Sequence, residues 1–419
     1  MEGDGSEAFP YGQIYDREEI NRALESETPY DIVPSRDDNG HGTFLAGVAA
    51  GGENRSEAFS GVAPLSELVV VKCKQAKKSY RRYYGIPDAA EAFQENDVLA
   101  GISYILRVAG RERKTVIICV GVGTNMGNHS GGTNLAVFME RYTAVPGVAM
   151  VACAGNEGNA RHHHAIQSRN DVININVEKN MDGFMTQLWW QTPGSLQLSI
   201  TSPRGETVRG IRAISGERFS HRFQPEDTVV DIYFGTAQEL TRQQVVIFRF
   251  QSVRSGIWKI ETEADFDDTR FNMWLPIRDF LSSPVEFLQP DPDMTICCPG
   301  SGMYTITVSA YDVVQDALYL SASRGFTPSG MVKPDIVAPG VNMVGPFPRN
   351  QYGTMSGTGV AAAFASGVAA LFMQQYGTPS GIALREVFIR GAEQRGVPYP
   401  NTEWGFGILN AYDSLLSEN

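Results

Sequence analysis

The strongest constraint on the fold is a change of texture part-way along the chain. From about residue 61 to 158, apolar runs such as Val116–Val120 alternate with segments of helical periodicity. Such alternation predicts a parallel sheet joined by right-handed helical crossovers. Between about 173 and 292 no convincing helix occurs, and short alternating strands such as Leu196–Ile200 follow one another. The α/β texture returns at Tyr304–Val308.

This order of patterns predicts an α/β fold, a parallel sheet flanked by helices, with an inserted all-β sandwich or jelly roll. The predicted domains are residues 1–172 and 293–419 for the two parts of the α/β domain, and 173–292 for the insert. The other predicted elements are strands at Leu68–Val71, Val148–Ala152, Val230–Tyr233, Val245–Phe250 and Ile257–Ile260, a helix at Asn134–Tyr142, and a helix capped by Asn96 or Asp97.

Composition excludes several classes of protein. The net charge of −12 argues against non-specific nucleic-acid binding. No apolar run reaches the ~18 residues that span a membrane, and Met1–Glu7 lacks the basic and apolar regions of a signal peptide. We therefore expect a soluble protein made in the cytoplasm. The basic run Lys72–Arg82 is interpreted as a solvated loop.

The five cysteines do not suggest a secreted disulfide framework. Cys73, Cys119 and Cys153 lie in apolar runs, where a free cysteine acts as a small hydrophobe. The adjacent Cys297 and Cys298 could form a vicinal disulfide, but two reduced thiols are favoured. A reducing compartment fits this usage.

A first candidate for chemistry is His41, which glycines flank at the start of a small-residue helix, Gly40-His41-Gly42-Thr43. A rigid helix end fixes the orientation of an imidazole, as a general base requires. Alone, the motif would fit a helix-capping histidine equally well.

A second candidate is Asn156, in the loop Gly155-Asn156-Glu157-Gly158 after an apolar run. A neutral amide donor suits a transient oxyanion. A turn asparagine before glycine is the simpler interpretation if the motif is taken alone.

A third motif, Met355-Ser356-Gly357-Thr358-Gly359, leads into a helix of small residues. Together the three motifs resemble those of subtilisin-like serine proteases, the subtilases, in order along about residues 10–172 and 293–419. The resemblance implies that His41 is the general base, that Asn156 and Gly155 belong to the oxyanion loop, and that Gly359 stands at the nucleophile position. It also implies that Gly121, Val122 and Gly123 form the strand that pairs with a peptide substrate. No cofactor or metal is implied.

The insert narrows the resemblance to the clostridial germination proteases of the Csp type, which carry a jelly roll inside the subtilase domain. Arg161-His162-His163-His164 fits that subgroup. The three histidines could alternatively bind a metal, but neighbours in an extended chain point to opposite faces. The subgroup implies peptide or protein ligands, related Csp-type proteins as partners, and the spore as a location.

Two departures from the family pattern bear on activity. Gly359 has no hydroxyl, and Ser356, the nearest substitute, belongs to the approach to the helix. Nothing in residues 1–40 fits the family's triad aspartate on an apolar strand. We therefore expect a truncated chain, with the strand that bears this aspartate missing upstream.

Three functions remain open on the sequence. The favoured one is a pseudoprotease that acts by binding, in the control of spore germination. The second is an active serine endopeptidase in which Ser356 substitutes for the nucleophile. The third is a degraded fragment without function.

Overall fold

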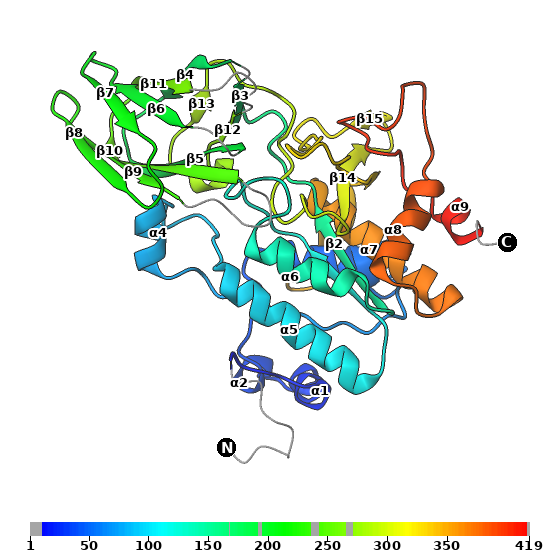
Figure 1. Cartoon of the computed structure of the whole chain (residues 1–419). Helices are drawn as coiled ribbons and strands as arrows, with labels where there is room; N and C mark the ends of the chain where they lie inside the picture. Colours follow the sequence, from blue (N-terminus) through cyan, green and yellow to red (C-terminus); the bar gives the residue numbers. More distant parts are fainter. Residues whose placement is uncertain (1–10, 167, 192–194, 236–242, 265–270, 417–419) are drawn as a thin grey trace.

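A computed structural model describes residues 11–166, 168–191, 195–235, 243–264 and 271–416. The residues discussed above at Met1–Glu7 lie outside these ranges. Two bodies make up the molecule, an α/β body and a β insert (Figure 1). No helix among the described residues is long and apolar enough to cross a membrane.

The α/β body is built on a parallel sheet in which β1 (Val116–Val120), β2 (Val148–Cys153), β14 (Ile306–Asp312) and β16 (Ile336–Pro339) run side by side. The sheet has apolar cores on both faces, which explains its continuous apolar strands. One core includes residues of α5 (Glu95–Glu112) and α6 (Asn134–Thr143), which lie in front of the sheet in Figure 1. The other includes residues of α7 (Thr358–Tyr376) and α8 (Gly381–Arg390).

The remaining elements of this body lie around the sheet. A hairpin, β17–β18, packs beside α3, and a two-residue strand, β15, pairs with β14. Their bounds are α1 Arg17–Glu25, α2 Pro29–Ile32, α3 His41–Ala50, α4 Lys78–Tyr84, β15 Ala317–Leu318, β17 Met343–Phe347, β18 Gln351–Met355 and α9 Ala411–Leu416.

The insert consists of two antiparallel sheets around one core, as the alternating strands predicted. Trp189 and Trp190 are buried in it, which confirms their assignment to the core. One sheet has the order β3 (His163–Ile166), β12 (Phe271–Trp274), β5 (Met181–Gln191), β10 (Gln243–Val253), β9 (Thr228–Phe234), β8 (Arg218–Phe223). The other has the order β13 (Val285–Phe287), β4 (Asn170–Val177), β11 (Gly256–Ala264), β6 (Leu196–Thr201), β7 (Thr207–Arg212). The insert boundaries at 173 and 292 stay predictions, and β3 already belongs to these sheets.

The two bodies meet in a stack of three rings. Trp274 of β12 lies between His129 and His163, with ring centroids 4.1 Å and 5.0 Å away. All three side chains are buried. Both ring nitrogens of His129 face backbone carbonyls, at 2.7 Å from Ile296 O and 3.1 Å from Asn125 O.

Stability is expected to fall as the pH drops from about 6.5 to 4, because burial lowers the pKa of His129 to about 4. An unfolded histidine titrates near 6.5, so the unfolded state takes up the proton first. The contribution is therefore fully present above pH 6.5, and about 3 kcal/mol is lost by pH 4. Urea denaturation across this range measures it. The His129→Gln variant should lack this part of the pH dependence; an unchanged slope would contradict the assignment.

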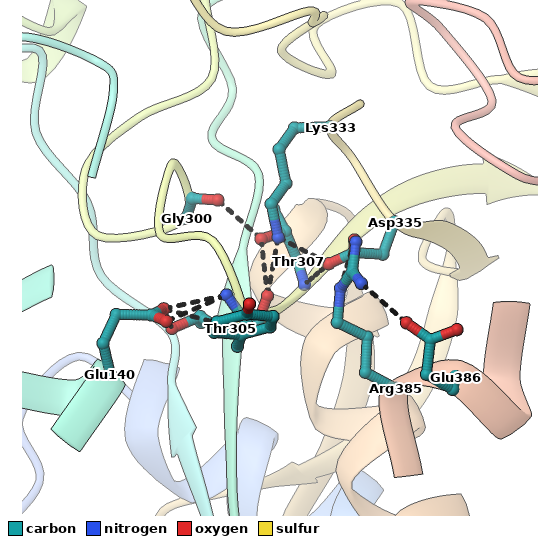
Figure 2. A network of polar contacts seen from close by, with 9 residues as sticks. Glu140, Gly300, Thr305, Thr307, Lys333, Asp335, Arg385 and Glu386 are labelled. Carbon is teal, nitrogen blue, oxygen red and sulfur yellow. Dashed lines mark hydrogen bonds and ion pairs between the residues drawn. The ribbon is translucent and has the colours of Figure 1, made fainter. Parts of the chain in front are cut away.

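A network of buried charges lies at the far edge of the parallel sheet (Figure 2). The ammonium of Lys333 is fully buried and donates to Asp335 Oδ2 and to Thr305 O, each at 2.7 Å. Arg385 holds the other oxygen of Asp335, with Nε at 2.8 Å. Burial lowers the pKa of Lys333, against the opposing charge of Asp335. Two cations thus depend on one buried carboxylate.

The structure corrects three expectations. Leu68–Val71 is not a strand but an exposed extended run, because no described strand lies beside it to pair with. Gln94 caps helix α5, not Asn96 or Asp97, which lie inside its first turn. The basic run Lys72–Arg82 is only partly a solvated loop, since its end forms α4 with Arg81 buried. The five cysteines are all free, as favoured.

Candidate functional site

His41 is the first residue of α3, held there by Asp37. The Asp37 carboxylate accepts hydrogen bonds from Gly40 N and Thr43 N, both at 2.9 Å, and from Thr43 Oγ1 at 2.6 Å. Burial opposes ionisation of Asp37, but these hydrogen bonds outweigh it and lower its pKa. This arrangement caps the orphan amides of the first turn and fixes the imidazole at the helix end.

The His41 ring has no hydrogen-bond partner among the described residues. Burial lowers the pKa of His41, while the charges of Glu91 and Asp37 oppose that shift. Glu91 accepts a hydrogen bond from Asn39 Nδ2, two residues before the histidine. A neutral imidazole with both nitrogens available is the form that accepts a proton.

Gly359 lies directly opposite His41. A Cβ atom built on Gly359 would lie 3.6 Å from His41 Nε2 and 3.5 Å from Gly121 O. These are ordinary van der Waals contacts, so a side chain would fit. The glycine leaves the space open and offers the imidazole no hydroxyl.

The hydroxyls near Gly359 are engaged elsewhere. Ser356 Oγ accepts a hydrogen bond of 2.8 Å from Asn342 N. Thr358 Oγ1 donates to Asn156 Oδ1 and accepts from Gly155 N, both at 3.1 Å. Neither hydroxyl is bonded to His41, so the structure offers no support for Ser356 as a substitute nucleophile.

Asn156 is held by one end of its amide. Its Oδ1 accepts from Thr358 N and Thr358 Oγ1, and its Nδ2 has no partner among the described residues. The side chain is exposed, near Gly357 at the start of α7. The geometry thus presents a free amide donor beside a helix N-terminus, a combination that favours negative charge.

The segment Gly121–Gly123 follows β1 and makes no backbone hydrogen bond with the described residues. Pairing resumes at Thr124, which exchanges two backbone hydrogen bonds with Cys298. Free peptide groups in this position suit an added strand. All the candidate residues line a single cavity of about 2690 Å³: His41, Gly121, Val122, Gly123, Gly155, Asn156 and Gly359.

Comparison with known proteins decides the family. The model described as "Subtilase family" matches residues 11–201 and 289–407, which is most of the chain. The chain belongs to the subtilases. The gap in that match falls within the insert of this subtilase.

Individual relatives agree with the assignment. The subtilase is 34% identical to serine protease AprX of Bacillus subtilis over 145 residues, 30% of this chain and 33% of that protein. It is 30% identical to mycosin-3 of Mycobacterium tuberculosis over 187 residues, 41% of this chain and 39% of that protein. These matches therefore span less than half the length of the curated relatives.

One solved structure covers nearly the whole subtilase. The CspB protease of Clostridium perfringens superposes with a TM-score of 0.86 and 26% identity, over 97% of this chain and 88% of that chain. Because this superposition includes the insert, the β module belongs to the architecture that the two chains share. The resemblance predicted from the motifs is confirmed at this level.

The three histidines after the asparagine loop act separately. His162 Nδ1 lies 2.6 Å from Glu157 Oε2, His163 Nε2 lies 2.9 Å from Asn272 Oδ1, and His164 Nδ1 lies 2.7 Å from Gln289 O. Among the described residues, no three His, Cys, Asp or Glu side chains are grouped to hold a metal ion.

Sequence reasoning missed three carboxylates of this subtilase. Asp37 and Glu91 act on His41, and Glu157 ties the asparagine loop to the insert by accepting from Arg278 N at 3.2 Å. Asp37 could have been found as a capping carboxylate just before a helix. Glu91 and Glu157 carried no signal, because their partners come together only in the fold.

Gly155→Ala is expected to destabilise the fold by roughly 1–3 kcal/mol more than Gly216→Ala. Both glycines have positive φ, +104° and +82°. A Cβ at Gly155 would clash with the Cys297 thiol, whereas nothing lies within 4 Å of one at Gly216. The control therefore isolates steric crowding from backbone strain. Urea denaturation measures both, and equal losses would show that Cys297 yields freely.

Proposed function

We propose that this subtilase is a pseudoprotease, which binds peptide or protein ligands and does not hydrolyse them. The observation that carries the proposal is the position of Gly359, whose Cβ would lie 3.6 Å from His41 Nε2. A nucleophile is needed at that place, and glycine supplies no oxygen. The neighbouring hydroxyls of Ser356 and Thr358 are bonded to other groups.

The rest of the site is suited to recognition. The free backbone of Gly121–Gly123 provides peptide groups for an added strand. The amide of Asn156 provides a donor at a fixed place. Such a cleft holds an extended peptide by main-chain hydrogen bonds, with side-chain pockets for specificity.

The biological setting we propose is the control of spore germination, with related Csp-type proteins as partners. The support is the likeness to the CspB protease of Clostridium perfringens over 97% of the chain. The inserted module, whose jelly-roll connectivity remains a prediction, would be a docking surface or a rigid support. Residence in the spore follows from the same proposal.

A binding experiment tests the proposal. Labelled peptides from a casein digest are titrated against the protein, and the bound fraction is recovered and identified by mass spectrometry. We expect bound peptides to be recovered uncut. Val122→Pro removes an N–H from the cleft strand and should weaken binding at least about tenfold. Val122→Ala keeps that N–H and is the matched control. Equal affinity for both variants, or no binding, would count against the cleft.

A further inference from the structure

The most unusual surface in the molecule is the run Leu68-Val69-Val70-Val71. These four residues are exposed by 53%, 38%, 67% and 36%. Consecutive β-branched residues that face solvent are uncommon in a folded chain and indicate an interaction site. The run is not loose, since a Cβ built on Gly101 of α5 would meet Val71 Cγ1 at 2.7 Å.

The backbone of this run is unpaired. Residues 67–74 make no backbone hydrogen bonds with any described residue. Extended backbone with free N–H and C=O groups is a template for pairing with another strand. Both the side chains and the peptide groups of the run therefore lack partners.

A second unpaired edge belongs to β1. Among the described strands, β1 pairs only with β2, so its other edge is open. Its burial reflects this, because three of its five residues are only partly buried, whereas every residue of β2 is buried. The apolar sequence Val116–Val120 has the composition of an interior strand in a parallel sheet, yet it stands at an edge.

The two unpaired segments line the same cavity of about 2690 Å³. Apolar side chains line it from both faces of the sheet, Ile102 and Ile105 on α5 and Ala370 and Leu371 on α7. Residues of β1 alternate between the two apolar cores on these faces. An occupant must therefore be apolar on both faces and offer peptide groups along both edges.

We propose that this part of the cavity, the strand slot, accepts one extended apolar peptide strand from a partner polypeptide. The strand pairs with the open edge of β1 and with the run Leu68–Val71. A helix would not meet these requirements, because its backbone groups are already bonded. A second copy is a poor occupant, because its described strands are paired in their own sheets and only the same run is free.

A designed peptide tests the slot directly. The probe is a fluorescein-labelled peptide, acetyl-Lys-Val-Ile-Val-Ile-Val-Lys-amide, followed by fluorescence anisotropy. We expect saturable binding, and at least tenfold weaker binding when proline replaces the central valine, because proline has no N–H for the ladder. Equal binding of both peptides would reduce the effect to hydrophobic adsorption and overturn the proposal, as would a lack of saturable binding.

Protein variants locate the site. Val70→Asp and Val70→Pro should each weaken binding at least tenfold, by charge and by loss of an N–H. Val314→Asp, at a residue 95% exposed outside the cavity, should have no effect. Hydrogen exchange should show protection at 68–72 and 116–120 on binding. Exchange unchanged there would contradict the proposal.

Two further results distinguish the strand slot from the cleft at Gly121–Gly123 and from self-association. Val122→Pro, which impairs the proposed cleft, should leave binding of the designed peptide unchanged, so the two sites fail or succeed independently. Light scattering should show the same mass for the parent protein and Val70→Asp. A dimer that Val70→Asp dissociates would assign the run to self-association and overturn the proposal.

Discussion

The Gly359→Ser variant is expected to react with a fluorophosphonate at least about 100 times faster than the parent chain. Its side chain would meet only ordinary contacts, and its Cβ would lie 3.6 Å from His41 Nε2. A hydroxyl one bond further is within reach of the imidazole, and general-base catalysis contributes roughly 10²–10⁴-fold. Asn156 offers an amide donor to the developing charge. Intact-protein mass against time gives the rate.

Peptide turnover by the same variant should nevertheless stay low. No carboxylate hydrogen-bonds the His41 ring among the described residues, and loss of an orienting carboxylate costs about 10⁴ in turnover. Gly359→Ala adds the same Cβ without a hydroxyl and should remain unlabelled. Combining Gly359→Ser with His41→Ala should remove most of the gain. Labelling that is indifferent to His41 would refute the geometry.

Asp335→Ala is expected to cost about 3–5 kcal/mol of folding stability, the largest loss that we predict for a single substitution. It removes the carboxylate that Lys333 and Arg385 share, and Lys333 is wholly buried. An uncompensated buried charge is far more costly than the pair is stabilising. Urea denaturation of the two proteins measures the difference.

Glu386→Ala is the matched control, because Glu386 pairs with the same Arg385 at 3.3 Å but is 54% exposed. A surface ion pair contributes at most about 1 kcal/mol. Similar losses for the two variants would mean that water reaches Lys333 and that the charge is not isolated.

The sequence predicted the order of strands and helices well wherever each strand finds its neighbour. β1 matches the predicted Val116–Val120, and the strands of the insert match to within a few residues. The run Leu68–Val71 failed for a physical reason. Its composition is that of an interior strand, but strand pairing depends on a neighbour, and none is present among the described residues.

The site was predicted in part. The motifs placed His41, Asn156 and Gly359 correctly in one cavity, because short fixed spacings position residues at helix and strand ends. The residues that tune the site were not predictable. Glu91 acts on a histidine 50 positions away, and Glu157 contacts a backbone amide more than 100 positions away. Such contacts depend on the tertiary fold and leave no local pattern.

The central claim is that this subtilase recognises peptides without cutting them, and incubation of the unaltered chain with casein tests it most directly. Mass spectrometry of the mixture over several hours follows the appearance of new peptide termini. The account predicts none above a buffer blank, with the protein itself unmodified. New termini that vanish when His41→Ala is introduced would contradict it.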